Sequence, residues 1–475
     1  MYSYGEMKDV RVPWWPTVIC ASLAGGMGWG IRGQYGHETG AMIAGALVCL
    51  VIGLTLCRNA GSLAVARAVA LGTVAMGFGG SETYGQTIGL TKDADFVGNW
   101  GVLAWGMLGL AIKGGVWIGF CGLLLGMGLG GKRYRAIEMF CLMIGALFAY
   151  ALGVYFLNMP HDLEARQLPR LYFSATWDLQ PNKADLRPRV EVWGGIWFAL
   201  LFVMAYAGAL RKDGLAWRLG LWGILGGALG FPIGQCIQAY HGWNVELFDE
   251  GLWKIVNWWN FMETTFGLVM GALLGLGAWL HRKRIQPVEY EGELANFAPL
   301  EWGLVIVHCA LLILSEFVIP FPIIGWAYDM GLVMGVIPLA AIVGGRWWPY
   351  LAILPVTLMP IVGKTVRNLA YENEEVSRLI GWSVYIVIPM ALAIGLAIWY
   401  QRKGRAGQTG TAFARGALLF CTWIYFTLNF AFFNFPWPWE TWTGRTPNAM
   451  VYVVCVVALT ALALFWGKGE RSRAA

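Results

Sequence analysis

Long apolar runs, each near the length of a membrane-spanning helix, recur along the chain from Pro13 to Trp466. Almost every run ends in a short polar loop. A helix needs about 20 apolar residues to cross a bilayer, so the pattern predicts about fourteen spans. Strands of a membrane barrel would alternate in polarity, and these runs do not. The sequence therefore predicts an all-α, polytopic membrane protein.

One apolar segment is too long for a simple span. Residues 98–131 form a run of about 34 residues, whereas about 20 would cross the bilayer. Such a run must tilt strongly or begin with a re-entrant piece.

The loops between the spans alternate in charge. Short cytoplasmic loops concentrate Lys and Arg, so the alternation predicts that both termini face the cytoplasm and that the acidic or mixed loops lie outside. We therefore expect a multi-pass protein of the plasma membrane, as in a bacterial inner membrane. The basic loops centre on residues 58–67, 132–135, 211–218, 281–284, 346, 402–405 and 468–473, and the other set comprises residues 83–97, 158–191, 241–256, 319–325, 364–380 and 434–447.

Composition supports the membrane assignment and limits the chemistry. Of 475 residues, 58% are hydrophobic and only 13% are charged, far from the averages of soluble domains. The net charge of +6 is spread over many loops, which disfavours binding of nucleic acid. The nine cysteines fall in apolar spans without a CxxC pair, and no phosphate-cradling loop has Walker spacing. We expect no disulfide, no metal site and no cofactor.

Glycine divides the chain into two halves near residue 290. About three quarters of the 64 glycines precede this point, and small residues let membrane helices approach closely. We expect residues 1–290 to form a Gly-rich half of about eight helices and residues 291–475 a second half of about six.

A phrase repeats within the Gly-rich half. GGMGWGIRGQ (25–34) is echoed by GTVAMGFGGSETYGQ (72–86) and GGALGFPIGQ (226–235), each running from Gly-aromatic to Gln. A second sequence pattern repeats in the helices that run back in the opposite direction, as HETGAMIAGAL (37–47) and METTFGLVMGAL (262–273). The predicted unit is a helical hairpin repeated in parallel, an arrangement found in some transporters.

Unusual polar residues gather at the outer ends of these helices. Ionisable groups at membrane depth are costly unless they face protein or water, so they are candidate functional residues, although an interfacial position would explain each alone. The set predicted to bind substrate or an ion comprises Arg32, Gln34, His37, Glu38, Glu82, Gln86, Lys113, Gln235, Gln238, His241 and Glu263.

The sequence suggests specific roles for the His37–Glu38 pair and for Lys113. His37 beside Glu38 is a candidate proton-handling pair, and Arg32 could fold back over Glu38 or simply neutralise it. Lys113 lies near the middle of the overlong segment, where it needs a buried partner, for which Glu82 and Glu263 are the candidates. If the segment began with a re-entrant turn, Lys113 would instead lie at the outer surface.

Three functions fit these features. The first is an ion-coupled transporter of a small polar solute with a polar cavity near the outer face. The second is a membrane-embedded transferase acting at the outer face on a lipid-linked or glycan substrate, with Glu38 or Glu263 as general base and Arg32 holding an anionic group. The third, weaker one is a subunit of a larger membrane complex. Expected partners are the lipid bilayer and a small polar solute or ion, and assembly into a homo-oligomer stays open.

Overall fold

The protein is a bundle of long helices. The computed structural model describes residues 12–33, 35, 39–79, 84–183, 185–289, 293–296, 298–317, 335–432 and 446–466. Helices make up 79% of it, and these residues contain no β-strand. The predicted all-helical class is therefore confirmed.

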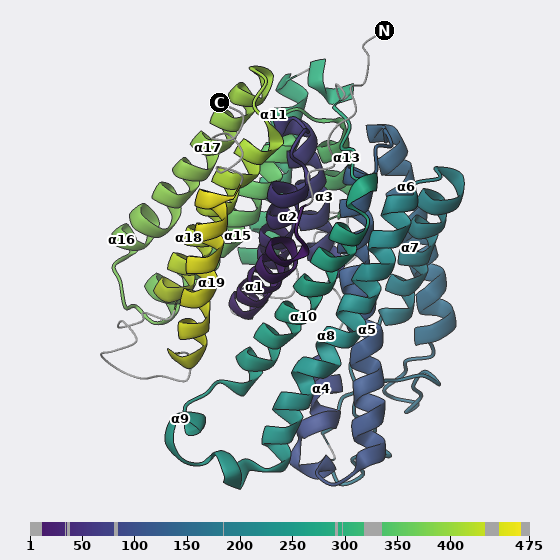
Figure 1. Ribbon diagram of the computed structural model, residues 1–475. Coiled ribbons are helices and arrows are strands. Elements are labelled where there is room, and N and C mark those ends of the chain that lie inside the picture. The colour runs from purple at the N-terminus through teal and green to yellow at the C-terminus, as the bar shows by residue number, and fades with distance from the viewer. Residues whose placement is uncertain are drawn as a thin grey trace.

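The helices of the Gly-rich half run up and down through the bundle (Figure 1). They are α1 (Trp14–Arg32), α2 (Ala41–Leu56), α3 (Ser62–Phe78), α4 (Gly85–Lys92), α5 (Trp100–Leu129), α6 (Ala136–Gly153), α7 (Trp193–Ala205), α8 (Gly214–Trp243), α9 (Gly251–Lys254) and α10 (Trp258–Leu280).

The helices of the second half pack beside them, with α18 against α2 and α19 against α1. They are α11 (Ala298–Phe317), α13 (Ile337–Gly344), α14 (Trp348–Leu351), α15 (Thr357–Val366), α16 (Arg378–Trp382), α17 (Ile388–Arg405), α18 (Gly410–Phe432) and α19 (Thr446–Phe465). Short π-helical segments join or extend several of them, namely η3 (Val154–Asn158), η4 (Tyr206–Leu210), η9 (Ala352–Val356), η10 (Arg367–Glu372) and η11 (Ser383–Val387).

Many of these helices suit a bilayer. Among the described residues, nine helices are long and apolar enough to cross a membrane, and three shorter apolar helices accompany them. A multi-pass, membrane-embedded protein is the class that this length and composition fit.

The overlong segment is a single helix, without a re-entrant piece. α5 is 30 residues long, and the Asn99 side chain caps it by accepting a hydrogen bond from the backbone N–H of Val102 at 3.1 Å. At 1.5 Å per residue such a helix spans about 45 Å, more than the ~30 Å hydrocarbon core. α8 is equally long and packs along α5.

Glycines bring these helices into close contact. A Cβ atom on Gly227 of α8 would overlap the carbonyl oxygen of Gly114 of α5. In the same way, a Cβ on Gly25 of α1 would overlap the carbonyl oxygen of Gly267 of α10, and the reverse overlap also holds. The Gly-rich sequence thus sets the spacing of both helix pairs, as expected for small residues in membrane helices.

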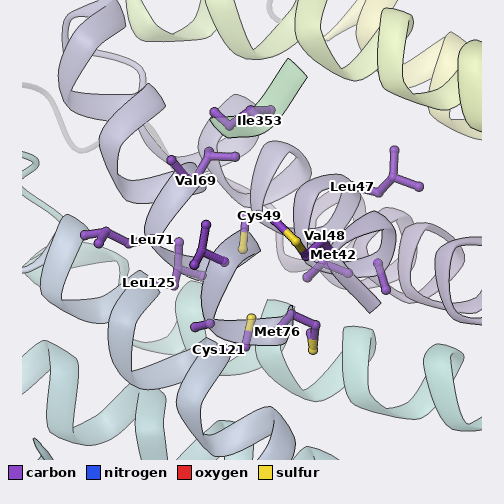
Figure 2. Close-up of a cluster of buried hydrophobic side chains, with 14 of the residues drawn as sticks. Met42, Leu47, Val48, Cys49, Val69, Leu71, Met76, Cys121, Leu125 and Ile353 are labelled. Carbon is purple, nitrogen blue, oxygen red and sulfur yellow. The ribbon is translucent and has the colours of Figure 1, made fainter. Parts of the chain in front are cut away.

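Aliphatic and sulfur-containing side chains fill the centre of the bundle. Figure 2 shows Met42 and Val48 of α2, Val69 and Met76 of α3, and Leu125 of α5 in one cluster. All nine cysteines are free.

The basic loops meet at one end of the bundle. The Arg211 guanidinium donates to the carbonyl oxygen of Arg133, and the backbone N–H of Ser62 donates to that of Gln408 at 2.9 Å. At the opposite end, the Trp243 indole donates to the Thr91 carbonyl oxygen at 2.9 Å. Each of these contacts joins two loops of the same charge pattern.

Candidate functional site

A buried ion pair joins α1 to α10. Arg32 is the last residue of α1, and Glu263 lies in the second turn of α10. The glycine contacts between the two helices bring the Arg32 Nη1 atom within 2.6 Å of the Glu263 Oε1 atom. Both side chains are only 2% exposed. Two residues predicted from sequence to belong to one site, 231 positions apart, are thus in direct contact.

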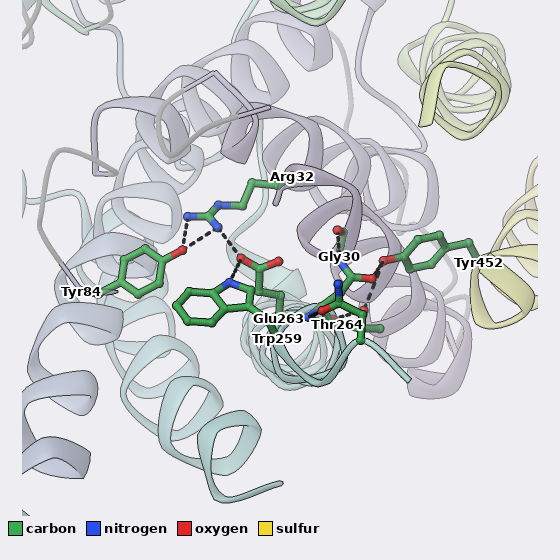
Figure 3. A network of polar contacts seen from close by, with 9 residues as sticks. Gly30, Arg32, Tyr84, Trp259, Glu263, Thr264 and Tyr452 are labelled. Carbon is green, nitrogen blue, oxygen red and sulfur yellow. Dashed lines mark hydrogen bonds and ion pairs between the residues drawn. The ribbon is translucent and has the colours of Figure 1, made fainter. Parts of the chain in front are cut away.

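Two aromatic side chains complete the hydrogen bonding of this pair (Figure 3). Both Nη atoms of Arg32 donate to the Tyr84 hydroxyl oxygen at 2.8 Å. The Trp259 indole N–H donates to Glu263 Oε1 at 3.1 Å. A Cβ atom on Gly33 would overlap Glu263 Oε2, so the glycine after α1 makes room for the carboxylate.

Aromatic rings enclose the guanidinium. The Arg32 Cζ atom lies 5.2 Å, 5.3 Å and 5.4 Å from the ring centres of Trp29, Tyr84 and Trp117. Cation–π contacts at these distances favour the charged guanidinium in a site without water.

The repeated phrase converges here through its aromatic residues. Trp29 of the first copy and Phe231 of the third both pack on Phe266, with ring centres 4.4 Å and 4.7 Å apart. The two described glutamines of the copies, Gln86 and Gln235, have separate partners. Gln235 donates to the Thr91 hydroxyl at 2.7 Å, whereas Gln86 contacts the outer loop, donating to the Arg187 carbonyl oxygen at 3.3 Å.

A second set of polar contacts ties the ion pair to the second half of the chain. The Asn260 amide donates to the carbonyl oxygen of Gly30, two residues before Arg32, at 2.5 Å. The Tyr452 hydroxyl of α19 donates to Asn260 Oδ1 at 2.7 Å, and Thr264 donates to the Asn260 carbonyl oxygen at 2.8 Å. Movement of α19 would therefore reach the ends of α1 and α10 that carry the pair.

An open cavity of about 310 Å³ lies next to this network, at the end of the bundle that holds the 158–191 loop. Trp259 is the shared element, because it lines the cavity and also donates to Glu263. The cavity carries three cationic side chains and one carboxylate. Its lining residues are Gly85, Gln86, Gly89, Lys92, Asp93, Ala175, Gln180, Lys183, Leu186, Arg189 and Trp259.

Asp95 contacts two of the residues that line this cavity. The carboxylate accepts hydrogen bonds from Gln180 at 2.6 Å and from Lys183 at 3.1 Å, both of which line the cavity. The bond from Lys183, followed by that from Gln180, lowers the pKa of Asp95 below its ordinary value. The outer loop is thus fastened to the start of α5 by a charged contact.

The structure gives Lys113 a partner that the sequence did not suggest. Its Nζ atom donates to Glu191 Oε1 and to the Thr87 hydroxyl, each at 2.8 Å. Glu263, one of the two candidates, is held by Arg32 and Trp259. Glu82, the other candidate, lies outside the described residues.

Glu191 was missed because it lies in the long outer loop, where a carboxylate is expected to be hydrated. In the structure it is 1% exposed and also accepts hydrogen bonds from the Ser174 hydroxyl at 2.7 Å and the Phe173 backbone N–H at 3.0 Å. The only sequence signal was that a buried Lys113 needed a carboxylate.

The remaining candidates are partly placed. Gln238 is buried in α8, and the His241 ring stacks on Trp258 at 4.4 Å near the helix end. Gln34, His37 and Glu38 lie outside the described residues, and so does the expected contact of Arg32 with Glu38. Within the described part of the chain, no three His, Cys, Asp or Glu side chains group closely enough to hold a metal.

No protein family, curated protein or solved structure matches this chain.

Proposed function

We propose that the chain crosses the membrane about fourteen times, eight in the first half and six in the second, with both termini in the cytoplasm. Nine long and three shorter apolar helices among the described residues support a count of this size, and α1, with 19 residues, adds a further span. The basic loops share one end of the bundle, which is assigned to the cytoplasm by their Lys and Arg content. A bacterial inner membrane fits this arrangement.

Within that membrane the protein transports a small polar solute, and the movement of the solute is coupled to a proton. The observation that carries this proposal is the buried Arg32–Glu263 pair, which the Trp259 side chain links to the neighbouring cavity. Ionisable groups buried in membrane proteins commonly mark solute paths and proton relays. Transporters also commonly bind their solute between helices whose ends meet inside the membrane.

The geometry suggests how the pair works. Arg32 stays charged, because guanidinium groups do not lose their proton in proteins and three aromatic rings stabilise the cation. Glu263 can take a proton from the outer cavity once Trp259 moves. A neutral Glu263 no longer compensates Arg32, which is then available to an anionic group of the solute. The α19 contact through Tyr452 and Asn260 connects this exchange to the second half.

One observation favours the transferase as a second candidate. The cavity lies at the outer end of the bundle, where the head of a lipid-linked substrate would be, and Glu263 could act there as general base. The enclosure of the ion pair by α1, α10 and aromatic side chains favours the transporter. A buried pair without an exit to either side would fit a structural subunit of a larger complex.

Reconstituted vesicles test the proposal. Full-length protein is placed in proteoliposomes containing a trapped pH dye, and a panel of amino acids, dicarboxylates and sugar phosphates is added outside. We expect one class of solute to acidify the lumen in the wild type. Glu263→Gln should lose at least 90% of that signal, whereas the matched control Glu164→Gln, exposed in the outer loop, should keep it.

A second variant distinguishes a loss of proton coupling from a folding defect. Trp259→Phe keeps the ring but removes the indole N–H bond to Glu263, so it should fold normally while the pH dependence of transport changes. Undiminished solute-driven proton movement in Glu263→Gln would disprove the coupling role. Turnover of a lipid-linked donor without uptake of any solute would favour the transferase.

A further inference from the structure

A second cavity, of about 330 Å³, lies at the basic-loop end, far from the Arg32–Glu263 pair along the helices. It is built where the two halves of the chain meet. Its lining residues are Leu63 of α3, Glu289 of the linker between the halves, Arg346 and Tyr350 around the start of α14, and Gln401, Gly404 and Arg405 at the end of α17.

Gln401 is the unusual member of this lining. It is 2% exposed, and neither its Oε1 nor its Nε2 atom has a hydrogen-bond partner. A buried polar group without a partner is destabilising, so such groups usually serve a ligand or bound water. This amide offers one acceptor and two donors side by side, which suits a hydroxyl group that both donates and accepts.

Charge defines the other part of the ligand. Two guanidinium groups, those of Arg346 and Arg405, face a single carboxylate, that of Glu289. The Arg405 Cζ atom lies 5.9 Å from the ring centre of Trp347, which positions the side chain at the cavity mouth. Guanidinium forks bind phosphate oxygens in pairs, and Glu289 can accept a hydrogen bond from a hydroxyl of the same ligand.

The Tyr350 hydroxyl shows that the floor of the cavity is ordered. It bonds to the Ser62 hydroxyl at 2.9 Å, and a Cβ atom on Gly404 would lie 2.6 Å from it. Gly404 therefore leaves the space in which the hydroxyl sits. The lining combines two cations, one anion, one unpartnered amide and one phenol in a volume suited to a small polar molecule.

We propose that this cavity binds a hydroxyl-bearing phosphate ester, with the phosphate on Arg346 and Arg405 and the hydroxyl groups on Gln401 and Glu289. The same chemistry is offered by a free polyol phosphate and by the glycerol phosphate head of an anionic lipid of the inner leaflet. The proposal is independent of transport at the outer cavity, since no residue is shared between the two cavities.

Calorimetry on the full-length protein in phosphatidylcholine nanodiscs tests the free source, with sn-glycerol 3-phosphate as the probe. Arg405→Gln and Gln401→Leu should each weaken binding at least tenfold. Arg402→Gln is the matched control, an exposed arginine on the same turn of α17 that does not line the cavity, and should bind like the wild type. Because Gln401→Leu removes an unpartnered amide, its melting temperature without ligand should not fall.

Native mass spectrometry from nanodiscs containing phosphatidylglycerol tests the lipid source. Retention of that lipid by the wild type but not by Arg405→Gln or Gln401→Leu would support the site with a lipid head as occupant. The proposal fails if neither probe binds, or if Arg402→Gln weakens binding as much as Arg405→Gln. It also fails if inorganic phosphate binds as tightly as sn-glycerol 3-phosphate, because the hydroxyl contacts would then contribute nothing.

Discussion

Glu191 and Lys113, 78 residues apart, form an ion pair of 2.8 Å that is almost completely buried. Lys113 lies in the interior of α5, whereas Glu191 ends the long outer loop just before α7. The loop is therefore part of the folded bundle, because its Glu191, Ser174 and Phe173 form the surroundings of a buried cation.

Removing this carboxylate should destabilise the protein strongly. Glu191→Gln removes a carboxylate from beside the buried Lys113 ammonium, and breaking a buried pair in this way costs about 3 to 5 kcal/mol. We expect a large drop in melting temperature in detergent, with little change for Glu164→Gln in the exposed part of the same loop. If the Lys113→Met/Glu191→Leu double variant is no more stable than Glu191→Gln, the uncompensated charge is not the cause.

Glycine contacts should limit substitution along α10. Gly271→Leu places a side chain against the backbone of α1 at Ala21, and overpacking of this kind costs about 1 to 3 kcal/mol or prevents assembly. The matched control is Gly395→Leu in α17, where no atom lies within 4 Å of a Cβ. The measurement is the yield of monodisperse protein in size-exclusion chromatography, and equal yields for the two variants would refute the packing role.

The contact of Asp95 with the outer loop should depend on pH. A carboxylate whose pKa is lowered by folding stabilises the folded form above its unfolded pKa of about 4, and the contribution is lost as the pH falls through the lower, folded value. Asp95→Asn should therefore increase amide exchange over residues 176–187 at pH 7. In the wild type, exchange over these residues should increase only in strong acid. Asp178→Asn, exposed in the same loop, is the control, and an equal increase there would contradict a specific contact.

Cysteine labelling should reveal the orientation. In a background without the exposed Cys141 and Cys236, we expect Glu164→Cys to react with an impermeant maleimide from outside and Lys403→Cys only from the cytoplasm. The reverse result would show the opposite topology, with the cavity next to the Arg32–Glu263 pair on the cytoplasmic side.

The sequence predicted the helical class, the close glycine packing and the proximity of Arg32 to Glu263. Each follows from a local pattern, since apolar runs predict helices and small residues mark close contacts. It did not suggest Glu191 as a partner of Lys113, because this carboxylate comes from a long loop whose fold no periodicity encodes. The roles of Tyr84, Trp259 and Tyr452 were also missed, since interface aromatic residues and buried hydrogen-bond donors look alike in a sequence.

The aromatic cage around Arg32 has an energetic consequence for transport. Arg32 is permanently charged, so the net charge of the pair can change only at Glu263, from zero to plus one on protonation. A solute with one negative charge would restore neutrality, and one proton would cross with each solute molecule. The cycle would then be electroneutral, unaffected by membrane voltage, and a pH difference of one unit would accumulate the solute about tenfold. Uptake that responds to a potential set by potassium and valinomycin would show that other charges move.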